Sequence, residues 1–155
     1  MRKRSIIAAI LCTCLCFWGC SEQENSRVLL ERSFFEDSWE RFDYVKNTIQ
    51  IEEETTYDLS MKISFTDDYP YDDFSMVFTV FDAADSPYRS KGYKFNLKES
   101  DGQWKAPSAN STHTFEFPIN KALTITDAGT YTFQIEYRMP YTPITGVKHL
   151  SLIRN

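Results

Sequence analysis

The clearest pattern along the chain is a period-two alternation of apolar and polar residues, strongest between positions 129 and 139. One set of positions is apolar and the intervening set is polar; the apolar positions are Tyr131, Phe133, Ile135 and Tyr137. Because successive side chains of a β-strand point to opposite faces, this alternation predicts a strand with one buried face. The spacing Asp127-x-Gly129-x-Tyr131 just before it is typical of a tyrosine corner, in which the phenol bonds back to upstream backbone. We expect these three residues to form a structural corner.

The same alternation recurs along most of the chain. It predicts strands over residues 47–53, 56–66, 74–81, 93–97, 112–117, 130–139 and 147–153, the third of them central because both its faces are apolar. Residues 34–42 suit an irregular segment or a short edge strand. Residues 82–91 and 105–111 indicate turns or loops, 101–102 a hairpin-type turn, and 121–123 one helical turn.

With no sustained 3.6-residue period, these segments predict one all-β domain over residues 28–155. We expect an antiparallel β-sandwich of about seven or eight strands, immunoglobulin-like or jelly-roll. The last strand is expected to pair antiparallel with the strand at 130–139.

The first twenty residues have the organisation of an export signal. A basic start, Arg2-Lys3-Arg4, precedes an apolar stretch at 6–17 that is too short to span a bilayer. Gly19-Cys20 then supplies a small residue before a cysteine, as at a lipoprotein cleavage site, although Phe17 stands where leucine is usual. We predict a lipoprotein signal peptide at 1–19 and a lipidated Cys20 opening a tether at 20–27; the alternative is an ordinary secretory signal cut nearby.

Cleavage at that site decides the cysteine chemistry. All other cysteines precede Cys20, so the mature protein keeps one thiol, which carries lipid, and the domain folds without a disulfide. Acyl chains on the thiol and the new amine anchor it firmly, at about 0.8 kcal/mol per buried methylene. The polar run 21–26 is either a short linker or a sorting signal of the kind found in Bacteroidota outer-membrane lipoproteins.

The net charge of the chain limits the classes of binding partner that can be expected. Removing the signal takes away the three positive charges of its basic start, so the net charge of −5 becomes −8. A strongly acidic chain without a basic cluster excludes nucleic acid and anionic head groups as expected partners. Membrane attachment is therefore expected through the lipid alone.

No pattern in the sequence indicates an enzyme, a cofactor or a dedicated metal site. The two histidines, His113 and His149, fall on predicted strands without a carboxylate pattern, so surface positions are expected. Nucleophile-elbow, zinc-protease and phosphate-loop motifs do not occur. The acidic loop Asp67–Asp73 supplies oxygen ligands for Ca²⁺ but lacks the alternating spacing of a calcium loop, and a solvated charged loop is the alternative.

Aromatic residues at turns are the remaining candidates for a binding surface. The rings that suit a sugar-stacking platform are Trp104, Tyr88, Tyr93, Tyr69, Tyr71 and Tyr141. β-Sandwich proteins also place many aromatic rings in the core, so the alternative is that these residues have only a structural role.

Several short motifs, taken in order, resemble the gliding-motility-associated lipoproteins of Bacteroidota known as the GldH family. The matching positions are Trp39 and Phe42, Thr56-Tyr57-Asp58-Leu59, Tyr69-Pro70-Tyr71 with Phe74, Gly102-Gln103-Trp104, the strand 129–135 through Met139, and Ile144-Thr145-Gly146-Val147. Two loops depart from the family pattern: 105–108 replaces a glycine-rich stretch, and Pro140 stands where arginine is common.

The resemblance implies an outer-membrane lipoprotein that serves gliding motility or the linked secretion machinery, without a catalytic residue. It implies a protein partner in the cell envelope, and Tyr69, Tyr71 and Trp104 are the candidate partner-binding residues. A surface lipoprotein that binds glycans through an aromatic platform is the alternative function.

The anchor can be tested directly. Cys20→Ala removes the acyl acceptor, so we expect an unacylated precursor or a released protein in place of the membrane-bound form. Mass spectrometry of the wild-type N-terminus is the measurement. An unmodified N-terminus at a residue beyond Cys20 would show that the segment is an ordinary secretory signal.

Overall fold

The computed structural model describes residues 27–155, so the predicted signal peptide, Cys20 and the tether before Arg27 lie outside the described residues. The described chain is all-β apart from one 3₁₀ turn, η1 (Phe35–Asp37). The strands are β1 (Val28–Ser33), β2 (Ser38–Trp39), β3 (Val45–Ile51), β4 (Thr55–Thr66), β5 (Asp73–Phe81), β6 (Pro87–Asn96), β7 (Ser108–Ala109), β8 (Thr112–Ile125), β9 (Gly129–Tyr137), β10 (Ile144–Thr145) and β11 (Val147–Arg154).

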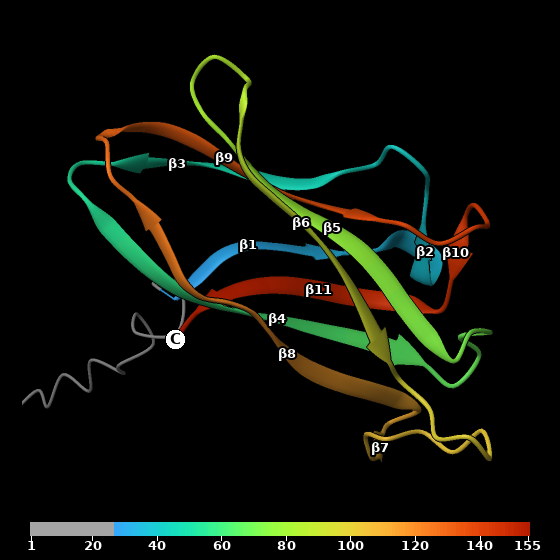
Figure 1. Ribbon diagram of the computed structural model, residues 1–155. Helices are drawn as coiled ribbons and strands as arrows, with labels where there is room; N and C mark the ends of the chain where they lie inside the picture. The colour runs from blue at the N-terminus through green and yellow to red at the C-terminus, as the bar shows by residue number, and fades with distance from the viewer. Residues whose placement is uncertain (1–26) are drawn as a thin grey trace, which may run out of the picture.

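Two antiparallel sheets face each other across the core (Figure 1). The first has the order β1-β11-β4-β8-β7, and the second has the order β3-β9-β5-β6. The two-residue strands β2 and β10 pair with each other at one end. The predicted antiparallel β-sandwich is confirmed, and the eight strands of six or more residues agree with the expected number.

The strand pairing decides between the two expected architectures. Pairs are nested outward from the β5–β6 hairpin: β4 pairs with β8, β3 with β9, β2 with β10, and β1 with β11. A single long hairpin rolled across two sheets produces this nesting, which is the organisation of a jelly roll. Most connections therefore pass from one sheet to the other.

Three local predictions were wrong. The last strand, β11, does not pair with β9; it pairs with β1 and β4 in the opposite sheet. Residues 121–123 are not a helical turn, because they continue β8, where Leu123 pairs with Tyr57. The second half of the expected turn at 82–91 is the start of β6, and β1 is a strand that the alternation did not reveal.

Alternating positions supply the core. The predicted apolar face of β4 is buried throughout, from Tyr57 to Phe65, and so is that of β9, from Tyr131 to Tyr137. The two sheets meet directly where the ring of Tyr57 contacts that of Phe133 edge-on, with 5.6 Å between centroids. Edge-to-face contact of this kind adds about 0.5–1.5 kcal/mol to the burial of the rings.

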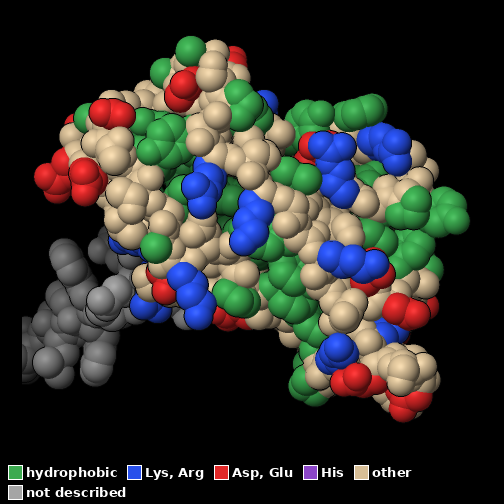
Figure 2. Space-filling view, in the orientation of Figure 1, with side chains coloured by type: hydrophobic (Ala, Val, Ile, Leu, Met, Phe, Trp, Pro, Cys, Tyr) green, Lys and Arg blue, Asp and Glu red, His purple; other side chains and the backbone are tan. Residues whose placement is uncertain are grey.

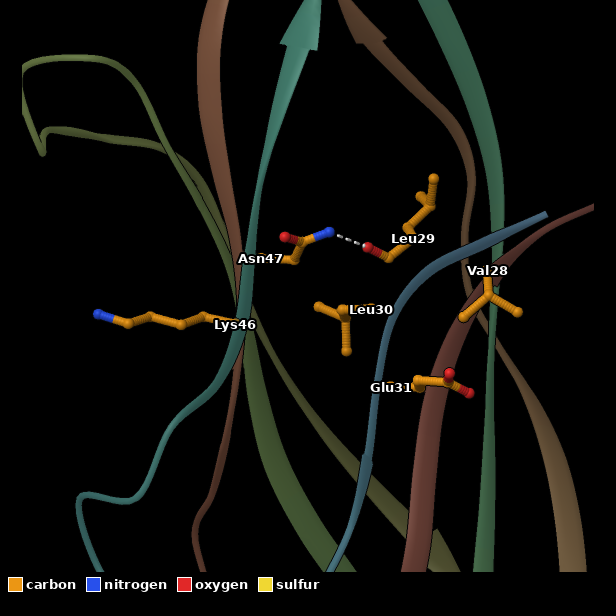
Figure 3. A pocket seen from close by; sticks show the side chains of 6 residues that line it. All are labelled: Val28, Leu29, Leu30, Glu31, Lys46 and Asn47. Carbon is orange, nitrogen blue, oxygen red and sulfur yellow. Dashed lines mark hydrogen bonds between the residues drawn. The ribbon is translucent and has the colours of Figure 1, made fainter. Parts of the chain in front are cut away.

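One side of the sandwich is closed by β1 and β3, which belong to different sheets. Figure 3 shows the side-chain amide of Asn47 on β3 donating a hydrogen bond to the backbone carbonyl of Leu29 on β1, at 2.7 Å. Leu30, 4% exposed, lies in the gap between the same two strands. Each sheet edge on this side is thus covered by the other.

Gly146 allows a close approach of two backbone segments. It has a φ of +80°, and a Cβ atom at this position would lie 2.7 Å from Cα of Tyr69. Its carbonyl also accepts the N–H of Thr66 at 2.9 Å. Gly146 therefore lets the turn before β11 pack against the turn that follows β4.

Two glycines with similar backbone angles make a matched test. Gly146→Ala places a methyl group in steric conflict with the backbone of Tyr69. The methyl group of Gly102→Ala, at a φ of +85°, has no other atom within 4 Å. Both changes carry the left-handed penalty of roughly 1–2 kcal/mol. We expect Gly146→Ala to lower the free energy of unfolding by about 1–3 kcal/mol more than Gly102→Ala, because overpacking is added. Equal losses in denaturant titrations would show that the approach is not tight.

Candidate functional site

The residues of the predicted corner lie together at the start of β9. The Tyr131 hydroxyl donates a hydrogen bond to the backbone carbonyl of Asp127 at 3.1 Å, and the ring meets that of Tyr88 edge-on. Gly129 has a φ of 159°, at the border of extended backbone. The pKa of Tyr131 is raised above its ordinary value, chiefly because the hydroxyl is removed from water. This contact holds the chain where it crosses from β8 to β9.

Tyr69 does not belong to an exposed surface, contrary to the expectation for a turn aromatic. It is 1% exposed, its ring lies 4.4 Å from that of Phe65, and its hydroxyl donates to the backbone carbonyl of Asp73 at 2.9 Å. Desolvation raises its pKa well above the ordinary value, with a smaller contribution from the Asp73 carboxylate. Tyr69 is a core residue that fixes the turn between β4 and β5.

Trp104 is half-buried and is packed by other side chains. The imidazole of His113 stacks on its indole, with centroids 4.1 Å apart and ring planes 10° apart. The Lys98 ammonium lies 4.8 Å from the indole centroid and donates a hydrogen bond to the backbone carbonyl of Tyr69. A sugar ring would need an open indole face, and much of this one is already occupied.

His113 is buried rather than on the surface as expected, with 5% of its area exposed. Its Nε2 lies 2.8 Å from an Asp67 carboxylate oxygen and its Nδ1 lies 2.9 Å from the Ala106 carbonyl oxygen. Both ring nitrogens of His113 are therefore engaged by oxygen atoms of the protein. No local pattern in the sequence indicates this pair, because its members are 46 positions apart. His149, in contrast, is partly exposed on β11 and lies 3.1 Å from the Ser33 hydroxyl.

The acidic loop distributes its carboxylates among basic partners. Asp73 pairs with Lys94 at 2.9 Å, Asp72 lies 3.8 Å from Lys98, and Asp67 binds His113. Among residues 27–155 no group of three or more His, Cys, Asp or Glu is placed to hold a metal ion. The loop therefore acts in the described structure as a set of separate ion pairs.

Exposed aromatic residues gather at one end of the sandwich, which we call the aromatic end. It is formed by residues 34–44, 67–72, 97–111 and 138–146, which join strands at the β2–β10 end in Figure 1. Figure 2 shows hydrophobic side chains at this end with Lys and Arg side chains beside them. The most exposed large rings here are Phe35 (83%), Phe42 (70%) and Tyr141 (63%).

Tyr71 and Tyr141 form a stacked pair across two loops. Their ring planes differ by 5° and their centroids are 5.9 Å apart. Phe42 lines a surface hollow together with Met139 and Pro140, directly before Tyr141 in the chain. We call Phe42, Tyr71, Pro140 and Tyr141 the aromatic patch.

The turn that presents Phe42 is fixed by several bonds. Phe42 has a φ of +66°, an unfavourable angle for a bulky side chain. Next to it, the Asp43 backbone carbonyl accepts the Trp39 indole N–H, and the Asp43 carboxylate pairs twice with Arg32 at 2.6 Å. The Arg41 N–H is bonded to the Thr142 hydroxyl, which ties the turn to the loop of Tyr141. Strained residues that are held by their surroundings cluster at functional sites, and Phe42, with its ring in solvent, is therefore a candidate for one.

The aromatic patch lies far from the point where the described chain begins. Val28 pairs with Ile153 near the C-terminus, and β1 runs from there to Ser33, opposite His149, on the way to the aromatic end. In Figure 1 the two ends of the described chain lie on the side opposite β2 and β10. We call that side, which also carries the turns at 52–54 and 126–128, the tether end. Among the described residues no helix is long and apolar enough to cross a bilayer.

Comparison with known protein families gives a match across most of the chain. A family model described as GldH lipoprotein matches residues 30–152. A search of curated protein sequences found no match.

Solved structures give only distant similarities. A ruminal GH26 endo-β-1,4-mannanase is 8% identical with a TM-score of 0.43, over 77% of this chain and 19% of that one. A family 35 carbohydrate-binding module from Clostridium thermocellum is 9% identical with a TM-score of 0.36, over 70% of this chain and 68% of that one. A CBM4 structure is 11% identical with a TM-score of 0.38, over 81% and 70% of the two chains. None of the three is similar enough to indicate a function.

The buried hydroxyl of Tyr69 gives a stability prediction with a control in the same loop. Tyr69→Phe leaves the Asp73 carbonyl without its donor, so we expect the free energy of unfolding to fall by about 1–3 kcal/mol. Tyr71→Phe, two positions on and half-buried, should change it by less than about 0.5 kcal/mol. Denaturant titration at unchanged slope is the measurement. Equal effects of the two changes would mean that the Tyr69 hydroxyl contributes nothing specific.

Proposed function

This chain belongs to the GldH lipoprotein family, a family of the gliding-motility type, and we propose that it is a non-enzymatic docking protein anchored by lipid in the outer membrane. In this role it holds a protein partner of the cell envelope that serves gliding motility or the linked secretion machinery. The aromatic patch is the surface that binds the partner.

The observation that carries the proposal is the exposed and rigidly held aromatic patch. Phe42 and Tyr141 are 70% and 63% exposed, although the turns that carry them are tied together by hydrogen bonds. Rigid aromatic side chains lose little conformational freedom on binding and dominate the energy of many protein interfaces. The hydrophobic rings beside Arg41 and Arg138 resemble such an interface in composition.

The aromatic patch lies at the end of the domain opposite to the end at which the proposed lipid anchor is attached. Six residues separate Cys20 from Arg27, and the seven steps between these two Cα atoms span at most roughly 25 Å in an extended chain. The twelve residues of β4, which runs between the two ends, extend about 40 Å. A lipid at Cys20 therefore leaves the aromatic end free to meet a partner away from the bilayer.

A protein partner fits this surface better than a glycan. Tyr69 is buried, Trp104 is packed against His113 and Lys98, and Tyr71 is stacked on Tyr141. Of the three residues that the sequence suggested for binding, only Tyr71 contributes to an exposed aromatic surface. These residues do not form the row of exposed ring faces that a polysaccharide needs.

The proposed absence of catalysis is supported by how the reactive groups are used. His113 and Asp67 form the one histidine–carboxylate pair among the ion pairs of residues 27–155, and this histidine is buried against Trp104. Its two ring nitrogens are both committed to hydrogen bonds. All four cysteines precede residue 27, so no thiol nucleophile belongs to the domain.

Photo-crosslinking in cells tests the proposed surface. A photoreactive amino acid is placed at Phe42 or Tyr141, and a matched control is placed at Glu53, an exposed residue of the tether end. We expect both positions of the aromatic patch to crosslink to the same envelope protein, identified by mass spectrometry, and Glu53 not to do so. Phe42→Ser should reduce the crosslink from position 141, because the two residues contact one partner.

Two other results would contradict the proposal. Equal crosslinking from Glu53 and from the patch would mean that contact with the partner is not specific to this surface. Saturable binding of the purified protein to polysaccharides, abolished by Tyr141→Ala, would replace the protein partner with a glycan.

A further inference from the structure

β6 is an edge strand of the second sheet. The strand is ten residues long, and among the described residues it pairs only with β5. Its first six residues, Pro87 to Gly92, are all exposed. Backbone N–H and C=O groups on the outer side of such a strand are a ready template for one more strand.

Side chains of β6 reach β8 across the gap between the sheets: the hydroxyls of Tyr88 and Tyr93 donate to backbone carbonyls of β8. Phe95 also stacks on Phe117, with 4.1 Å between centroids.

The backbone of β6 still has no strand on its outer side among the described residues, whereas the other long edges are covered or interrupted. β3 and β1, the edges on one side, cover each other through the Asn47–Leu29 hydrogen bond. On the other side, β8 is paired with β7 at its start and carries Pro118, which has no N–H to offer. β6 has no proline after its first residue, Pro87.

The charge of β6 is opposite to that of the protein as a whole. Arg89, Lys91 and Lys94 give it three positive charges and it contains no acidic residue, in a chain of net charge −5. Arg89 and Lys91 lie on one face of the strand and Lys94 on the other, where it pairs with Asp73. Figure 2 shows Lys and Arg side chains along the face of the molecule where β6 lies in Figure 1.

Gly92 places no side chain in the middle of this strand. An added Cβ would meet nothing closer than the Met76 carbonyl oxygen, at 4.0 Å, so packing within the domain does not require glycine here. A glycine within a strand weakens it, and it often marks a place where another backbone approaches closely. Gly92 fits such an approach from the open side.

We propose that β6 binds an extended acidic segment of another protein by strand addition. The backbone of the segment extends the second sheet, and its carboxylates pair with Arg89 and Lys91 on one face of β6. A second copy of this chain does not suit the edge, because two β6 strands side by side would bring like charges together. The inference stands apart from the aromatic patch and does not depend on the function proposed for it.

The binding test uses full-length protein in detergent and a fluorescent peptide of about ten residues in which Glu alternates with Val and Thr. We expect saturable binding that weakens as salt is added. A peptide with Gln in place of Glu should bind at least roughly tenfold more weakly. A peptide with an N-methyl group on every residue keeps its charge but has no N–H on either edge to pair with β6, so it should not bind.

Variants of the protein locate the site. Lys91→Glu should weaken peptide binding at least roughly tenfold, and Lys62→Glu, an exposed change on the central strand β4 of the other sheet, should leave it unchanged. Phe42→Ser should also leave it unchanged, which separates this site from the aromatic patch. In hydrogen exchange, the peptide should slow the amides of residues 87–96.

Any of four results would overturn the proposal. These are an absence of saturable binding, equal binding of the N-methylated peptide, equal loss from Lys62→Glu and Lys91→Glu, and unchanged exchange at residues 87–96. Equal binding of the methylated peptide would mean that charge alone attracts it. Peptide-independent pairing of two copies, detected by sedimentation and removed by Lys91→Glu, would assign the edge to self-association instead.

Discussion

The packing around Trp39 is the contact on which the aromatic end depends. Its ring is 1% exposed, stacks on Phe34 at 4.6 Å and meets Tyr137 edge-on at 5.2 Å. Through the pairing of β2 with β10 it joins the opening segment of the chain to the closing one. Its indole N–H also binds the carbonyl of Asp43, next to Phe42. One buried ring therefore closes the sandwich and sets the turn that exposes another ring to solvent.

The rolled hairpin gives the domain two ends with different surroundings. Because pairs are nested, the first and last strands lie side by side, and the described chain begins and ends at the tether end. The loops that carry most of the turn motifs, at 69–71, 102–104 and 139–146, gather at the opposite end. In the function proposed above, this fold would separate attachment from recognition within one domain.

The sequence predicted the strands well, because half-buried strands alternate. Alternation reports which face is buried but not which strand is the neighbour, so the partner of β11 was predicted wrongly. Lys121-Ala122-Leu123 has good helix formers, but pairing along β4 overrides that local preference. β1 was missed because Val28-Leu29-Leu30 reads as a plain apolar run before a polar one.

The candidate site was less predictable, because exposure at a turn depends on distant contacts. Tyr69 and Tyr71 are two positions apart in one motif, but the approach of Gly146 buries the first and leaves the second partly exposed. His113 meets Asp67 only because β8 lies beside β4. Phe42 is exposed because its turn is tied to Trp39 and Thr142, which the local sequence does not reveal.

The central claim is that the lipid holds one end of the domain and leaves the aromatic end away from the bilayer. Full-length lipidated protein in vesicles with spin-labelled lipids tests it, using one fluorophore at position 53 or at position 141. The account predicts strong quenching at the tether end and little at the aromatic end. Equal quenching, or stronger quenching at position 141, would contradict it, because the aromatic patch would then face the membrane.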